Sequence, residues 1–337
     1  ATVSFVRSFL FNRSQRVVVN ADYSNLGYIE CGVPQGSVLG PLLFCIFIND
    51  LPLHIVNKAV SLDLFADDSS LHTSSSDVKT AQSHLQEELN NVAKWCTCNK
   101  MIVHPQKTKS MVITSRQKHQ RAPLTLNLYL GSDPIEQVSV HKVLGVTIDE
   151  ELKWSHHINN VTKAVSKNLF LLGKLRYYLD ADAMRMFFHA HCLSHINYVS
   201  TVWSNAREVH LKKLNSLHRR AGKLIVPNPY LSTSEKLQAA KIIPLKQQFQ
   251  LNTAVLVYKV KHGLAPKYIE RLLTSSDNRY GSHKFLLPKT RIDLYKTSFS
   301  FSGASVWNTL PVNLQSSGSL CSFKRNTKKH LLLNCAV

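Results

Sequence analysis

Apolar residues fall into short runs in the first part of the chain. Their spacing over residues 2–11 predicts a helix, and the run at 17–19 predicts a strand that residues 22–25 turn back. Residues 39–50 are apolar almost all round and follow a Gly- and Pro-containing stretch, so they predict a buried helix. This part of the chain therefore mixes strands with helices.

A pair of carboxylates interrupts the next apolar pattern. Residues 60–66 read as a strand and residues 69–73 as its return, with Asp67 and Asp68 between them. Neighbouring anions repel each other, and removing them from water is costly unless cations pair with them. The doublet therefore indicates either a solvated turn or a site that holds something positive.

A helix and further strands are predicted before residue 150. Ser76 or Asp77 can cap a helix whose apolar residues follow a 3.6-residue period. Residues 110–114 read as a strand, and leucines alternate along 124–130 before a turn at 131–133. These segments complete an α+β pattern.

Helical periodicity dominates from residue 150 onward. Ser155 can cap a helix with apolar residues at Ile158, Val161, Val165 and Leu169. Three further helices are expected around 184–202, 211–225 and 245–262. The last 60 residues are polar, Ser-rich and basic, and their pattern assigns no fold.

The net charge of +20 is unevenly distributed. Residues 1–150 hold 13 Lys and Arg against 13 Asp and Glu, whereas residues 151–337 hold 28 against 8. A neutral, acid-bearing half joined to a basic half favours a protein that binds a polyanion with one part and carries out chemistry with the other. Charge alone leaves membranes and acidic proteins open as partners.

Cysteine usage and hydropathy predict an intracellular protein, in the nucleus or cytoplasm, and no secretion. The seven cysteines include no CxxC pair, and no secretory leader is visible. The longest apolar stretch, 38–48, is shorter than the roughly 20 residues of a membrane span, so no membrane is expected. His189 and Cys192 share a helical face, but zinc needs four converging ligands, which disfavours a zinc site.

Two motifs carry a family resemblance. The stretch C-G-V-P-Q-G-S-V-L-G-P-L-L-F at 31–44 precedes L-F-A-D-D at 64–68. Their order and spacing resemble the nucleotide-pocket loop and the metal-binding turn of reverse transcriptases from non-LTR (LINE-like, jockey-type) retrotransposons. Residues 142–149 are similar to that family's primer-gripping hairpin, and residues 302–311 resemble a tail found in many animal elements of this type.

The resemblance implies a fold class and a division of the chain. We expect an α+β fold: a reverse-transcriptase-like palm, with an antiparallel sheet backed by helices, that is incomplete at its N-terminus and is followed by an α-helical thumb. The implied parts are a partial palm at 1–150, a thumb at 151–225 and a basic C-terminal extension at 226–337.

The resemblance also implies site residues and ligands. Asp67 and Asp68 would hold Mg²⁺, with Mn²⁺ as a possible substitute, and Lys107 would assist the departing pyrophosphate, although a surface lysine fits Lys107 equally well. The implied contacts to template and nucleotide are Pro34, Gln35, Gly36, Phe65 and Ala66. Leu144 and Gly145 would grip the primer. The implied partners are an RNA template, a DNA primer and a dNTP, while the oligomeric state stays open.

The family's third metal-binding aspartate has no clear counterpart. It should lie on a strand before the glycine loop, where only Asp22 and Glu30 are acidic. Asp22 reads as part of a turn, so it is disfavoured as that ligand. The family's fingers region and endonuclease have no counterpart either. The sequence therefore predicts a C-terminal part of a polymerase with little or no activity as this chain.

Two other functions compete with this interpretation. The first is a decayed or co-opted copy that binds nucleic acid through its basic half without catalysis. The second is an RNA-dependent RNA polymerase, which shares a palm with metal-binding carboxylates but is disfavoured by the F-A-D-D sequence at 65–68. Nucleic-acid binding without primer extension would favour the first competitor.

Overall fold

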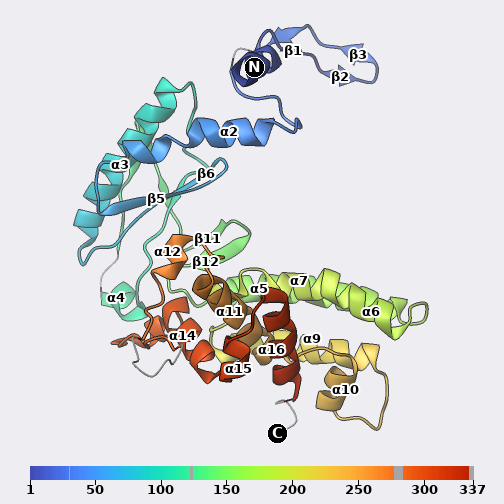
Figure 1. The fold of residues 1–337 in the computed structure, drawn as a ribbon. Coiled ribbons are helices and arrows are strands. Elements are labelled where there is room, and N and C mark those ends of the chain that lie inside the picture. Colours follow the sequence, from blue (N-terminus) through green and yellow to red (C-terminus); the bar gives the residue numbers. More distant parts are fainter. Residues whose placement is uncertain (30, 122–123, 277–283, 334–337) are drawn as a thin grey trace. The chain divides into compact units, whose positions relative to one another are not determined.

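The chain forms two compact units, Ala1–His141 and Lys142–Val337 (Figure 1). This computed structural model describes residues 1–29, 31–121, 124–276 and 284–333. The fold is mixed α+β in the first unit and mostly helical in the second. The finer division into parts ending at 150 and 225 stays a prediction.

The first unit contains short strands paired two by two. Four pairs are antiparallel, β1–β4, β2–β3, β5–β6 and β8–β9, and the pair β7–β10 is parallel. Its elements are α1 (Thr2–Leu10), β1 (Ser14–Gln15), β2 (Val18–Val19), β3 (Asp22–Tyr23), β4 (Gly27–Tyr28), α2 (Gly40–Ile48), η1 (Leu51–His54), β5 (Val60–Phe65), β6 (Asp68–Thr73), α3 (Val78–Cys98), β7 (Lys109–Ser110), α4 (Arg116–Arg121), β8 (Tyr129–Leu130), β9 (Asp133–Pro134) and β10 (Glu136–Gln137).

The first predicted turn lies two residues earlier than expected. Asn20 and Ala21 have positive φ angles of 48° and 72° and reverse the chain between β2 and β3. Asp22 is consequently a strand residue that pairs with Val19, and the prediction of a turn at 22–25 is wrong. Asn tolerates this conformation well, which is the signal that the sequence offered.

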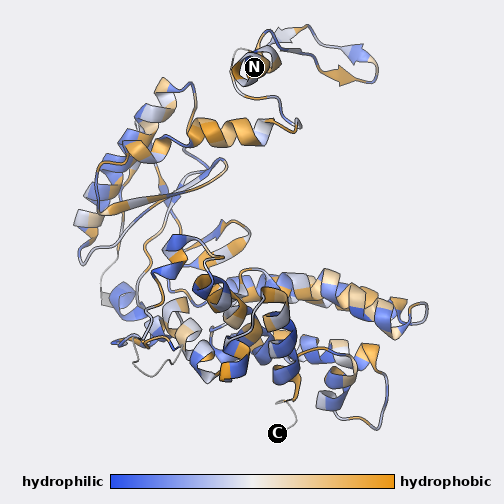
Figure 2. Ribbon diagram, in the orientation of Figure 1, coloured by the Kyte–Doolittle hydropathy of each residue, from blue (hydrophilic) through white to orange (hydrophobic). Residues whose placement is uncertain are grey.

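Helix α2 forms as predicted but is not buried. Only Gly40 and Ile48 are buried in it, whereas Leu42 is 58% and Ile46 is 64% exposed. Figure 2 shows the helix as strongly hydrophobic along nearly its whole length. The apolar composition therefore predicted the helix but overestimated its burial among the described residues.

A small core fixes the β5–β6 hairpin against α3. Trp95 and Val92 of α3 pack with Leu51, and Leu62 and Leu71 of the hairpin lie against this cluster. The Asp77 carboxylate accepts a hydrogen bond from the Thr80 amide, which confirms the predicted cap of α3.

The strands predicted at 110–114 and 124–130 are largely absent. Only Ser110, in β7, and the last two residues of the leucine run, in β8, lie in strands. The alternation nevertheless marks the buried side, because Leu126, Leu128 and Leu130 are all buried against α3. The side-chain oxygens of Gln82 and Gln86 in α3 accept hydrogen bonds from the backbone amides of Asn127 and Tyr129. These bonds replace those that a neighbouring strand would make.

The second unit begins with a hairpin and continues as helices. Its elements are β11 (Val140–Val143, which starts at the end of the first unit), β12 (Val146–Asp149), α5 (Ser155–Leu175), α6 (Ala181–Phe188), the π-helical turn η2 (His189–Leu193), α7 (Ser194–Asn197), α8 (Ser200–Trp203), α9 (Glu208–Ile225), α10 (Thr233–Ala239), α11 (Leu245–Lys261), α12 (Lys267–Glu270), α13 (Asp293–Lys296), α14 (Phe299–Thr309), α15 (Val312–Gln315) and α16 (Leu320–Leu333).

Helix α5 begins differently from the prediction. Ser155 is its first residue and not its cap. The Asp149 carboxylate fixes the segment that leads into the helix, because it accepts hydrogen bonds from the amides of Glu151, Lys153 and Trp154 at 3.2, 2.9 and 2.8 Å. The predicted apolar face of α5 is confirmed, since its residues are buried.

Two apolar clusters hold the helices of the second unit together. One runs from Val146 to Phe249 and includes Trp203, and the other runs from Ala254 to Phe323 and includes Trp307. Helix α11 contributes to both. The last residues, which had no predicted fold, are therefore largely helical, and small side chains at 302–304 let α14 pack on α11.

Across the ranges that the structure describes, no helix combines the length and the apolar character that crossing a bilayer requires.

Candidate active site

The carboxylate doublet lies at the tip of the β5–β6 hairpin. Phe65 pairs with Asp68, so Ala66 and Asp67 form a two-residue turn. Ala66 has a φ of 52°, which side-chain-bearing residues seldom adopt. Asp67, Asp68 and Phe65 are all exposed. The local fold therefore presents both carboxylates to solvent.

The two faces of this hairpin differ in character. Leu62 and Leu64 alternate with Asp63 and Phe65, so one face of β5 packs on the α3 core while the other stays open. On the open face the Asp63 carboxylate lies 3.5 Å from the His72 ring. Asp68 belongs to the same open face by register.

The chemistry of the doublet suits a hard divalent cation. Carboxylate oxygens are the ligands that Mg²⁺ prefers, and Asp67 and Asp68 supply two carboxylates. Among the residues placed by the structure, no group of three His, Cys, Asp or Glu side chains could hold a metal. Asp22 lies in the separate β2–β3 pair.

The glycine loop before α2 is fixed by one serine. The Ser37 hydroxyl donates to the Pro34 carbonyl at 2.7 Å and accepts from the Gly40 amide at 3.0 Å. Gly36 has a φ of 78°, where a side chain would be strained, and Gln35 is exposed. A Cβ on Gly40 would lie 2.9 Å from both the Pro34 oxygen and the Ser37 hydroxyl, so the loop requires glycine there.

Lys107 lies on an exposed loop after α3. Its amide donates to the His104 carbonyl at 3.1 Å, which belongs to a turn at 104–108. Lys109, the nearby cation, is instead paired with the Glu136 carboxylate at 2.5 Å. In the described part of the chain no carboxylate pairs with Lys107, so its charge is available to a ligand.

The turn implied as the primer grip belongs to the second unit. Leu144 and Gly145 both have positive φ, 47° and 83°, which is the geometry of a type I′ hairpin turn. The Tyr198 hydroxyl donates to the Leu144 carbonyl at 2.6 Å, and its ring lies 3.4 Å from the position of a Cβ on Gly145. A tyrosine therefore supports this turn from the helical region.

The structure groups the sequence-predicted residues in two sets. Asp67, Asp68, Phe65, Ala66, Lys107 and the loop Pro34–Gly36 belong to the first unit, and Leu144–Gly145 to the second. The roles of all these residues stay predictions.

Sequence reasoning missed several residues that shape these segments. Ser37 and Gly40 fix the glycine loop, Tyr198 supports the 144–145 turn, and the buried Glu88 carboxylate accepts the amides of Val56 and Asn57 before β5. A serine three residues before Gly40 was the available signal in the loop. Glu88 and Tyr198 act over long sequence separations, so no local pattern could reveal them.

The histidines near Cys192 do not assemble a metal centre in the described residues. Cys192 is fully buried, and burial raises the pKa of its thiol to about 12, which keeps it protonated. Trp203 and Trp307 are also fully buried, so they are core residues whose rings are not exposed for a nucleic-acid base to stack on.

A comparison with protein families identifies the first part of the chain. Residues 2–148 match the model of the reverse transcriptase (RNA-dependent DNA polymerase) family. This part of the chain is a reverse transcriptase domain, and the chain is distantly homologous to the enzymes of non-LTR retrotransposons.

Curated relatives come from insect mobile elements. The chain is 31% identical over 236 residues to the probable RNA-directed DNA polymerase from transposon BS of Drosophila melanogaster, covering 67% of this chain and 25% of that protein. It is 28% identical over 276 residues to the RNA-directed DNA polymerase from mobile element jockey of the same species, covering 79% and 28%. The chain thus spans about a quarter of these relatives.

Proposed function

We propose that this chain is the palm and thumb portion of an RNA-directed DNA polymerase, with the β5–β6 tip as part of its active site. One observation carries this proposal. Within the matched domain, a hairpin fixed by its apolar face presents two consecutive exposed carboxylates, Asp67 and Asp68, at its tip. Apolar anchoring positions the doublet more firmly than a free surface turn would.

Each set of residues in the proposed site has its own role. Divalent ions, Mg²⁺ or Mn²⁺, would activate the primer 3′-hydroxyl and stabilise the leaving pyrophosphate when bound. Asp67 and Asp68 hold them, and the residues at 34–36, with Phe65 and Ala66, contact the template base and nucleotide. Lys107 offers positive charge to the pyrophosphate.

The primer is the partner of the second unit in this proposal. Leu144 and Gly145 contact it through a tight turn whose backbone Tyr198 holds in place. The excess of positive charge in residues 151–337 supplies attraction for the RNA template and DNA primer.

The isolated chain is proposed to have little or no polymerase activity. Two carboxylates leave the ions short of one protein ligand, which lowers affinity and misplaces the charge. Asp22 is a strand residue and not a turn residue, but its β2–β3 pair shares no hydrogen-bonded ladder with β5–β6, and this separation supports this part of the proposal.

A primer-extension assay on an RNA template, run beside a binding assay, tests the proposal. We expect the chain to bind primer–template with an affinity that falls steeply with salt, and to extend it negligibly. Mg²⁺-dependent extension that Asp67→Ala abolishes and Asp63→Ala preserves would contradict the proposed inactivity. Failure to bind primer–template at low salt would contradict the assignment itself.

A non-catalytic nucleic-acid-binding role is the second candidate. Two observations favour this role. The helical unit has apolar clusters of its own, and residues 151–337 carry the charge excess. Salt-dependent binding to primer–template that Asp67→Ala and Asp68→Ala leave unchanged, together with an absence of Mn²⁺ binding at the doublet, would favour this role.

A further inference from the structure

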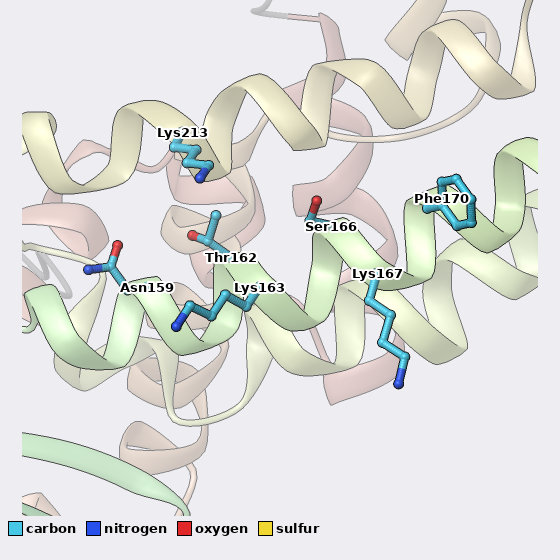
Figure 3. A pocket seen from close by; sticks show the side chains of 7 residues that line it. All are labelled: Asn159, Thr162, Lys163, Ser166, Lys167, Phe170 and Lys213. Carbon is cyan, nitrogen blue, oxygen red and sulfur yellow. The ribbon is translucent and has the colours of Figure 1, made fainter.

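Helices α5 and α9 of the second unit enclose a hollow with basic walls. The hollow has a volume of about 430 Å³, and Figure 3 shows the side chains that line it. Its lining residues are Asn159, Thr162, Lys163, Ser166, Lys167 and Phe170 from α5 and Lys213 from α9. The α5 residues recur every three or four positions, so they form one continuous face of the helix.

Three lysines line this hollow. In Figure 3 Lys213 extends from α9 toward α5, whereas Lys167 extends away from α9. Over the described ranges, Lys163, Lys167 and Lys213 form no ion pair with a carboxylate. Lysine side chains are flexible and can turn toward a ligand, and an anion bound along this face would be attracted by all three positive charges. The hollow is therefore suited to a ligand with several negative charges.

A buried hydroxyl gives the hollow a specific polar contact. Thr162 is only 3% exposed, and its hydroxyl has no hydrogen-bond partner in the part of the chain that the structure describes. Figure 3 shows its side chain directed toward α9, from which Lys213 extends back toward α5. Buried hydroxyls normally have a partner, and a ligand oxygen would accept this hydrogen bond.

An aromatic ring stands at one end of the hollow. Phe170 is 63% exposed, and the Lys174 ammonium lies 5.6 Å from its ring centroid. Exposed Tyr177 and Tyr178 lie just beyond the end of α5, with the Arg176 guanidinium 4.6 Å from the Tyr177 ring. Exposed rings alternating with cations are typical of sites that stack on unpaired bases.

The dimensions agree with a strand of several nucleotides. From Asn159 to Phe170 the helix rises about 16 Å, at about 1.5 Å per residue. A strand in a duplex advances roughly 3.4 Å per phosphate, and an extended unpaired strand spaces its phosphates more widely, so a few phosphates can lie along this face.

We propose that the hollow between α5 and α9 binds an unpaired nucleic-acid strand. The phosphates contact Lys163, Lys167 and Lys213, one phosphate oxygen accepts from the Thr162 hydroxyl, and a base stacks on Phe170. This inference rests on the proposed function, in which the chain handles nucleic acid, and it deepens that function by naming a site for strand segments outside the duplex.

The test measures binding of the full chain to a short unpaired oligonucleotide and to a duplex of the same sequence, by fluorescence anisotropy across a salt series. The triple variant with Lys163→Gln, Lys167→Gln and Lys213→Gln should bind the unpaired strand about tenfold or more weakly, with a salt slope smaller by about 2. Its affinity for the duplex should change by no more than about twofold, because the proposed site contacts only the unpaired strand.

Single substitutions with matched neighbours separate binding from folding. Lys213→Gln should weaken binding of the unpaired strand and Lys212→Gln should not, although both lysines are exposed on α9. Phe170→Ala should weaken it and Leu171→Ala should not. Thr162→Val should weaken binding while leaving the melting temperature unchanged or higher, because it removes an unpartnered buried hydroxyl.

The outcomes discriminate between this inference and the proposed function. Equal losses for the unpaired strand and the duplex, or no loss in any variant, would overturn the inference and leave the proposed function standing. Competition by inorganic tripolyphosphate as strong as that by the oligonucleotide, at equal phosphate concentration, would assign the hollow to free polyphosphates and overturn it. Absence of binding to both nucleic acids would contradict the inference and the proposed function together.

Discussion

Asp149 illustrates how a single residue determines the local structure of the second unit. Its buried carboxylate accepts three backbone hydrogen bonds between β12 and α5, so one side chain closes the connection from hairpin to helix. Ser37 plays a similar role in the glycine loop, where its hydroxyl bonds to both Pro34 and Gly40. In both places a polar side chain satisfies backbone groups that no strand or helix could satisfy.

Replacing Asp149 with Ala should destabilise the second unit by about 3 kcal/mol, because amides that donate to a charged group lose their acceptor. Urea unfolding measures this loss. Glu150→Ala, a change of the neighbouring acid, should stay within about 0.5 kcal/mol of the parent chain. Equal effects of the two substitutions would contradict the role assigned to Asp149.

Gly40→Ala should destabilise the loop before α2 by roughly 1–3 kcal/mol, because the new methyl group meets the Pro34 carbonyl and the Ser37 hydroxyl. Gly27 is the matched control, since a Cβ there has its nearest contact at an ordinary 3.8 Å. Amide hydrogen exchange in the loop reports the effect locally. Unchanged exchange in Gly40→Ala would show that the loop accommodates a side chain.

At the scale of elements, the sequence predicted helices better than their environments. Residues 158–172 carried a strict 3.6-residue apolar period, and the corresponding side chains of α5 are buried. Residues 39–50 carry apolar side chains on every face, so their periodicity cannot indicate which side of the helix is buried. In the structure α2 is largely exposed.

The candidate site was predictable only where its residues are close in sequence. The hairpin at 60–73 follows from local alternation and a two-residue turn. The support of Leu144 by Tyr198, 54 positions later, and of the segment before β5 by Glu88, about 30 positions later, depends on tertiary packing. No periodic pattern encodes such contacts.

The exposed face of α2 predicts a solubility effect. Leu42→Gln combined with Ile46→Gln should reduce concentration-dependent aggregation, because both side chains lie in solvent. Unfolding free energy should change by no more than about 0.5 kcal/mol. Leu51→Gln, at a buried position, should unfold the first unit instead. Loss of stability in the α2 variant would indicate that this face is covered in the folded chain.

For the molecule as a whole, buried histidines make the stability of the helical unit depend on pH. Burial lowers the pKa of His218 to about 4, and neither of its ring nitrogens has a hydrogen-bond partner among the described residues. Burial, with Lys328 and Arg185 nearby, also lowers the pKa of His189. Folding therefore favours the neutral rings.

Acidification should destabilise the chain by a defined route. The folded-state pKa of His218 lies below the unfolded value near 6.5, so the unfolded chain takes up the proton first as pH falls. The contribution of His218 to the free energy of unfolding is fully present above about pH 6.5 and falls by about 3 kcal/mol towards pH 4. His218→Leu should flatten this decline in thermal unfolding scans, and an unchanged profile would contradict the assignment.

The proposed function depends on divalent-cation binding by the doublet at the β5–β6 tip. Electron paramagnetic resonance of Mn²⁺ titrated with the full chain tests it directly, because bound Mn²⁺ loses its free-ion signal. We predict a weak site that is lost when Asp67→Asn and Asp68→Asn are combined and is retained in Asp63→Asn, which removes an exposed carboxylate from the same hairpin. Identical Mn²⁺ binding by the parent chain and the double variant would contradict the claim.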